Sequence, residues 1–81
     1  MTNKEMILDS LIDDDEAFTQ IVEYFELAAE IKISHFEITS LLAEMIEEGY
    51  IFVNYNWKTE NDEYPYSLTE KGKKAWNEIK W

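Results

Sequence analysis

The chain has 81 residues and no cysteine, and acidic residues outnumber basic ones so strongly that the formal net charge is −11. This length predicts a single domain over residues 1–81, and the lack of cysteine excludes disulfides and thiolate chemistry. Apolar residues make up 46% of the chain and aromatic residues 15%, which favours a folded globule over disorder. No apolar run approaches the roughly 20 residues needed to cross a membrane, and no signal-peptide pattern is present. We therefore expect a cytoplasmic protein without membrane contact.

The negative charge is concentrated in the first part of the chain. Residues 1–49 hold 13 acidic residues and 2 lysines, residues 50–81 hold 5 of each, and arginine is absent. Non-specific DNA binding depends on Lys and Arg neutralising phosphates, so this charge disfavours DNA and favours a basic partner. The alternative is that the acidity only keeps a small protein soluble.

Two helices are predicted before residue 31, over about residues 3–12 and 16–30. The acidic run 13–16 separates them, and Asp13 and Glu16 have the spacing of a capping box for the second helix. Three adjacent aspartates also suggest a metal site, but the glycine and the distal glutamate of a calcium loop are missing. We predict no metal and no cofactor.

The third predicted helix has both of its ends marked. Ser34 and Glu37 have capping-box spacing at its start, and Gly49 supplies the left-handed residue that ends a helix. Between them, apolar residues recur at helical spacing and predict one buried stripe: Ile38, Leu41, Leu42, Met45 and Ile46.

The pattern changes to an alternation of period two after Gly49. Residues 50–57 predict a strand, residues 58–63 a polar hairpin tip, and residues 64–68 a returning strand. Pro65 confines the returning strand to an edge or shortens it, because proline has no N–H for the ladder. Thr69 then caps a final helix that extends to about residue 80.

Two stretches resemble winged-helix regulators of the MarR and PadR type. Residues 66–72 carry the pattern Y-x-L-T-x-x-G, and residues 41–51 resemble the passage from the recognition helix into the wing. In the first pattern Leu68 ends a strand, Thr69 caps a helix, and Gly72 lets that helix approach the sheet. The resemblance covers roughly residues 34–76. It implies an α+β winged helix-turn-helix fold with a three-helix core, a two- or three-stranded β-wing and a C-terminal helix. In such domains the position of the β-prone link 31–33 commonly supplies a small first strand.

The resemblance also implies that the third helix enters the major groove of DNA. At 100° per residue, the positions opposite its buried stripe carry none of the Arg, Lys, Asn or Gln side chains that usually read base edges. These outward residues are Phe36, Ser40, Ala43, Glu44 and Glu47. The departure favours protein contacts, and we predict a partner-binding surface made of these five residues together with Tyr50, Phe52 and Trp81.

The leading hypothesis is therefore a non-catalytic, acidic winged-helix regulatory module of bacterial or phage type that binds a basic protein partner. In a sharper version, its carboxylates imitate DNA phosphates. The alternative is a dimeric DNA-binding transcription regulator that uses Lys71, Lys73 and Lys74, and in either case the C-terminal helix is a candidate for homodimer formation. An enzyme is not expected, because His35 is the sole histidine and a glycine-rich phosphate loop is absent.

Overall fold

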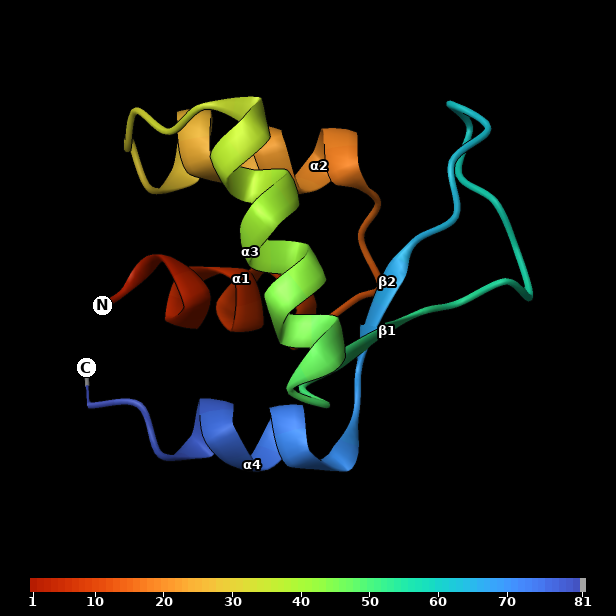
Figure 1. Ribbon diagram of the computed structural model, residues 1–81. Coiled ribbons are helices and arrows are strands. Elements are labelled where there is room, and N and C mark those ends of the chain that lie inside the picture. The colour runs from red at the N-terminus through yellow and green to blue at the C-terminus, as the bar shows by residue number, and fades with distance from the viewer. Residues whose placement is uncertain (81) are drawn as a thin grey trace.

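The structure is a computed structural model that describes residues 1–80, so the prediction for Trp81 lies outside the described residues. Its elements follow the predicted order (Figure 1): α1 Asn3–Leu11, α2 Phe18–Glu23, the π-helical segment η1 Tyr24–Ala28, α3 His35–Glu47, β1 Ile51–Val53, β2 Tyr66–Leu68 and α4 Glu70–Asn77. The predicted α+β winged-helix fold is confirmed, with two antiparallel strands. Within residues 1–80, no helix is long and apolar enough to cross a membrane.

Helix α1 lies at the centre of the molecule, in contact with α3, α4 and β2. Figure 1 shows α3 crossing α1 and α2 on one side, while α4 runs along the other side of α1. The core draws on every helix and both strands, and among its most buried side chains are Ile7, Ile21, Phe25, Ile38, Leu42, Met45 and Ile51. This packing holds α3 in place while leaving its outer face free.

The acidic run 13–16 does not cap α2, so the predicted capping box of Asp13 and Glu16 is wrong. Helix α2 begins after Ala17, whose backbone N–H donates to Gln20 Oε1 at 2.8 Å. The run instead bends at residues 13–14, and the backbone of Glu16 at its end forms an isolated antiparallel bridge with Tyr66. This bridge lies on the opposite side of β2 from β1.

The predicted helix over residues 16–30 is shorter and changes its winding near its end. The N–H of Ala29 donates to the carbonyl of Tyr24 and that of Ile31 to the carbonyl of Phe25, each at 2.9 Å, and Glu30 has a φ of +54°. Residues 31–33 form no strand. The Glu16–Tyr66 bridge takes the place of the small first strand in this sheet.

Helix α3 begins and ends where the sequence predicts. Ser34 Oγ accepts the N–H of Glu37 at 3.0 Å, while the Glu37 carboxylate accepts from Asn3 Nδ2 at 3.4 Å instead of closing the capping box. Gly49 adopts a φ of +83° and ends the helix. Of the predicted stripe, Ile38, Leu42 and Met45 are buried and Leu41 is half-buried. Ile46 is 40% exposed, because the stripe turns away from the core in the last turn of the helix.

The wing consists of β1, β2 and the connecting residues 54–65. In the sheet, Ile51 pairs with Leu68 and Val53 with Tyr66. The strand pattern predicted to residue 57 ends at Val53. The N–H of Asn54 still donates to the carbonyl of Pro65, but proline has no N–H to return the bond. Pro65 thus shortens β2, as predicted.

Helix α4 is held tightly against the start of the sheet. Thr69 Oγ1 accepts the N–H of Gly72 at 3.0 Å and donates to the carbonyl of Gly49 at 2.6 Å. A Cβ at position 72 would lie 2.1 Å from the backbone oxygen of Tyr50. The sequence-based prediction that Gly72 allows a close approach is therefore confirmed.

Candidate nucleic-acid interface

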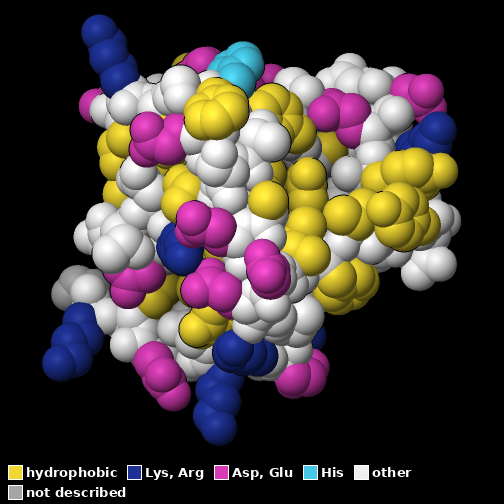
Figure 2. Space-filling model, viewed as in Figure 1, with side chains coloured by type: hydrophobic (Ala, Val, Ile, Leu, Met, Phe, Trp, Pro, Cys, Tyr) yellow, Lys and Arg dark blue, Asp and Glu magenta, His cyan; other side chains and the backbone are white. Residues whose placement is uncertain are grey.

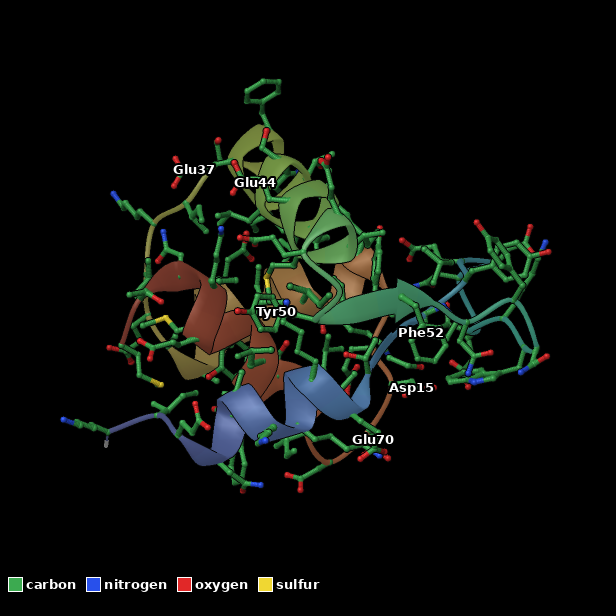
Figure 3. The ribbon with its side chains drawn as sticks, turned by 60° about the horizontal axis from the view of Figure 1, so that its bottom comes forward. Asp15, Glu37, Glu44, Tyr50, Phe52 and Glu70 are labelled. Carbon is green, nitrogen blue, oxygen red and sulfur yellow. The ribbon has the colours of Figure 1, made fainter. Side chains whose placement is uncertain are left out.

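The outer face of α3 carries all five residues that the helical wheel places there. Their spacing of three or four positions puts them in one row, and each is exposed: Phe36, Ser40, Ala43, Glu44 and Glu47. Phe36 is the extreme case, with 81% of its surface exposed. Figure 3 shows Glu37 and Glu44 on α3, Tyr50 in the link that follows it and Phe52 on β1. The elements that would meet a groove of DNA in a winged-helix protein are thus open to a partner.

Two carboxylates at the C-terminal end of α3 share an ion pair with one lysine from another helix. Lys4 Nζ, on α1, lies 3.1 Å from a Glu44 oxygen and 3.0 Å from a Glu48 oxygen. Hydrogen bonds to Glu48 and then Glu44 raise the pKa of Lys4. Figure 2 shows acidic side chains gathered over α3 with a lysine among them. Part of the negative charge that the sequence places on α3 is therefore cancelled locally.

One end of the predicted partner-binding surface, at Tyr50, is partly covered by a side chain of α4. Tyr50 is half-buried, and Lys71 Nζ lies 4.5 Å from the centre of its ring. The same ammonium donates to the backbone carbonyl of Glu48 at 2.6 Å, at the negative end of α3. Phe52, by contrast, is exposed on β1.

The wing adds exposed aromatic rings beside α3. Tyr55 and Tyr64 meet edge to face with ring centroids 4.9 Å apart, and Lys58 lies over the Tyr64 ring. Trp57 is also exposed. Figure 2 shows these apolar side chains gathered over the wing. A molecule seated on α3 and the wing would meet carboxylates, aromatic rings and few cations.

The three lysines of the alternative hypothesis lie on α4, away from the outer row of α3. Lys71 is engaged at the end of α3 as described, and Lys73 lies 3.5 Å from Glu70. Lys74 is exposed and has no ion pair within the part of the chain that the structure describes. All three nevertheless line one shallow hollow on α4, together with Glu70 and Asn77.

Sequence reasoning missed Lys4, and no local signal could have found it. Its carboxylate partners are 40 or more positions away, so only the packing of α1 against α3 brings them together. His35 packs edge to face on Phe18, with ring centroids 5.6 Å apart. Over residues 1–80, no group of three or more His, Cys, Asp or Glu side chains is arranged to hold a metal ion.

These features define a winged helix-turn-helix protein: a three-helix core, an exposed third helix and a two-stranded wing followed directly by a helix. Solved structures of PadR regulators share this architecture. A PadR family transcription regulator from Clostridium difficile superposes with a TM-score of 0.79 at 17% identity, covering 93% of this chain and 79% of that one.

Other solved structures are more similar in sequence. PadR of Bacillus subtilis, solved in complex with operator DNA, has a TM-score of 0.74 at 26% identity over 91% of this chain. Lactococcus lactis ZitR, solved as a double mutant, has a TM-score of 0.73 at 25% identity over 96% of this chain. The chain spans only 44% of that PadR chain and 49% of the ZitR chain. No protein-family model matches the sequence, and neither does any curated protein.

Proposed function

We propose that this protein is a non-catalytic winged-helix transcription regulator that binds duplex DNA through α3 and the wing. The observation that carries the proposal is the similarity to Bacillus subtilis PadR in its complex with operator DNA, which extends over 91% of this chain. The proposal reverses the preference drawn from charge alone. It rests on the shared fold and on the open outer face of α3.

The structure suggests how an acidic helix could face DNA. Lys4 already pairs with Glu44 and Glu48, which lowers the repulsion that phosphates would meet there. At the centre of the row, Ser40 can bond to several base edges and Ala43 can contact a thymine methyl group. Glu47, which has no ion pair among the described residues, could accept a hydrogen bond from the amino group of cytosine.

A homodimer belongs to the same proposal. Winged-helix and other helix-turn-helix dimers read two half-sites about one DNA turn apart, so their operators are palindromic. The C-terminal helix α4, with its exposed Lys73 and Lys74, is the element we propose for subunit contact. Sedimentation equilibrium of the full chain measures this directly.

A second function is favoured by one observation: the exposed row of α3 carries no Lys, Arg, Asn or Gln, and it includes the unpaired Glu47 and the exposed Phe36. This surface suits a basic, partly apolar protein. In that case the protein acts through protein contacts, for example by presenting carboxylates in place of DNA phosphates.

Titration with labelled duplex DNA separates the two functions. Random duplexes are selected for binding at about 50 mM salt, where electrostatic attraction is strongest, and the enriched sequence is titrated. The proposal predicts an enriched, saturable sequence whose binding is lost in Ala43→Glu and kept in Lys80→Gln, an equal charge change at an exposed residue beyond α4. The protein-contact function would instead be supported by two results together. No DNA sequence would be enriched, and the protein would bind a basic protein with an affinity that Phe36→Ser and Glu47→Gln weaken.

A further inference from the structure

A groove of about 550 Å³ lies between the end of η1 and the start of α3. It is formed by the end of the second helical segment, the link and the first turn of α3, and its lining residues are Glu26, Glu30, Ile31, Lys32, Ile33, Ser34 and Glu37. Ile31 and Ile33 are half-buried and supply its apolar floor. The link between η1 and α3, which carries most of the lining residues, is the yellow loop beside the upper end of α3 in Figure 1.

One large apolar side chain that adjoins a lining residue in the sequence is left in solvent. Leu27, which follows the lining residue Glu26, is 76% exposed. Exposed apolar side chains grouped around a hollow with a polar rim mark surfaces that bind other molecules. The groove therefore combines two isoleucines in its lining with an exposed leucine that adjoins it in the sequence.

The rim of the groove is acidic in a place where a helix disfavours acids. Glu30 lies just beyond the carboxyl end of η1, where the helix dipole attracts cations and repels carboxylates, and Glu26 lies within η1. Neither carboxylate has an ion pair among the described residues, and Glu30 occupies a left-handed position that glycine would fill at lower cost. With Glu37 on the opposite side, the rim holds three carboxylates against the single cation of Lys32.

We propose that this groove binds a basic amphipathic peptide segment of a partner protein. Apolar side chains of the peptide would cover Ile31, Ile33 and the exposed Leu27, while its Lys or Arg side chains would meet the carboxylates of the rim. The same charge repels nucleic acid and anionic membranes, so the occupant is a peptide rather than either of these. The proposal does not depend on DNA binding, because the groove lies beside α3 and not along its outer row.

The test uses a labelled synthetic peptide of about 14 residues, roughly four helical turns, with leucines on one face and lysines on the other. Fluorescence anisotropy is expected to show saturable binding to the full-length protein that weakens with salt. Reversing the charge of both Glu26 and Glu30 in the variant Glu26→Lys/Glu30→Lys turns two attractions into repulsions, so we expect about tenfold weaker binding. The exposed Leu27→Ser variant should also bind more weakly without affecting the fold.

The matched control is the double variant Glu60→Lys/Glu78→Lys, which changes the net charge equally at exposed sites outside the groove. If binding weakened as much in this control as in Glu26→Lys/Glu30→Lys, the effect would come from net charge alone. That result would overturn the proposal. Equal binding of a peptide with serine in place of leucine would overturn it as well. So would self-association that the Glu26→Lys/Glu30→Lys variant abolishes, because the groove would then belong to a second copy of the chain.

Discussion

Gly72 leaves room for a backbone oxygen, and this contact makes the position sensitive to any added side-chain atom. A Cβ there would lie 2.1 Å from the Tyr50 oxygen and 3.2 Å from Leu68 Cδ2. Within a helix, alanine is favoured over glycine by about 1 kcal/mol, but a clash with backbone atoms cannot be relieved by a side-chain rotation. We expect Gly72→Ala to lower the free energy of unfolding by about 2–3 kcal/mol, measured by urea denaturation.

Gly49→Ala is the control for this substitution. At Gly49 the φ of +83° is unfavourable for alanine, but the nearest atom to a new Cβ is Lys71 Cδ at 3.9 Å. A cost of about 1 kcal/mol is expected from the backbone conformation alone. If Gly72→Ala proved no more destabilising than Gly49→Ala, the close approach of α4 to the sheet would be wrong.

Asp9 joins two aromatic side chains from distant parts of the chain. Its carboxylate accepts from Tyr24 Oη at 2.6 Å and from Trp76 Nε1 at 3.1 Å. Burial, and then the bond to Asp9, raise the pKa of Tyr24 well above its ordinary value of 10.0. The folded protein therefore keeps this phenol protonated at a pH where the unfolded chain has lost the proton.

Alkaline unfolding should reveal this bond. A raised folded-state pKa stabilises the protein fully below the unfolded value of about 10, and that stabilisation is lost as the pH rises toward the folded value. The difference in unfolding free energy between the natural protein and Tyr24→Phe is thus expected to shrink between about pH 9 and about pH 12. Urea denaturation across this range measures it, and a constant difference would contradict the assignment.

For single residues, the sequence predicts hydrogen bonds between near neighbours in the chain. The caps at Ser34 and Thr69 and the turn at Gly49 were predictable because each bond closes within three residues. The bonds of Asp9 join residues 15 and 67 positions apart, and no local pattern contains them.

Among the elements, one amide side chain of the wing bonds to the segment before α2. Asn54 Nδ2 donates to Asp15 Oδ2 at 3.0 Å, and its Oδ1 accepts the N–H of Asn56 at 3.0 Å. We expect Asn54→Ala to lower the unfolding free energy by about 1–2 kcal/mol, because partly buried partners lose their bonds. Hydrogen exchange should also quicken at the amides of Glu16 and Asn56.

Asn61→Ala at the exposed wing tip provides the comparison, since it removes an amide that the structure leaves in solvent. The two variants should differ clearly in hydrogen exchange of the Glu16 amide, which bonds to the Tyr66 carbonyl. Similar exchange in both would show that Asn54 does not hold the wing.

Helix α3 carries a prediction that follows from the proposed function. Glu47 is its one outer carboxylate without an ion pair among the described residues, so Glu47→Lys removes a repulsion and adds a phosphate contact. DNA affinity should rise, and the slope of log affinity against log salt should steepen by about one unit. The variant Glu78→Lys, on the far side at the end of α4, should change the slope less.

The elements show where pattern reading succeeds and where it fails. Helix α3 was predictable because one apolar stripe lies between two marked ends. The second helix was not, because its final turn widens to place Phe25 in the core, and residues 31–33 follow a bend at Glu30 rather than a strand. The candidate row on α3 follows from periodicity alone. The ion pairs of Lys4 with Glu44 and Glu48 depend on how α1 packs against α3.

The whole molecule carries a net charge of −11, and this charge should make its stability depend on salt. Screening weakens repulsion between exposed carboxylates more than a few ångströms apart. We expect the Tm to rise by a few degrees as NaCl increases from about 10 mM to about 200 mM. Calorimetry measures this, and the less acidic variant Glu60→Lys/Glu78→Lys should show a smaller rise.

The wing and the segment before α2 are joined at three points. Asp15 accepts from Asn54, the backbone of Glu16 pairs with Tyr66, and Thr19 Oγ1 donates to Glu63 Oε2 at 2.6 Å. Residues 15–19 and the wing therefore form one transplantable unit, although the 31 residues 20–50 separate them in the chain. A chimaera that grafts this wing onto another winged-helix scaffold would need residues 15–19 as well, and a graft of the hairpin alone should lose its orientation.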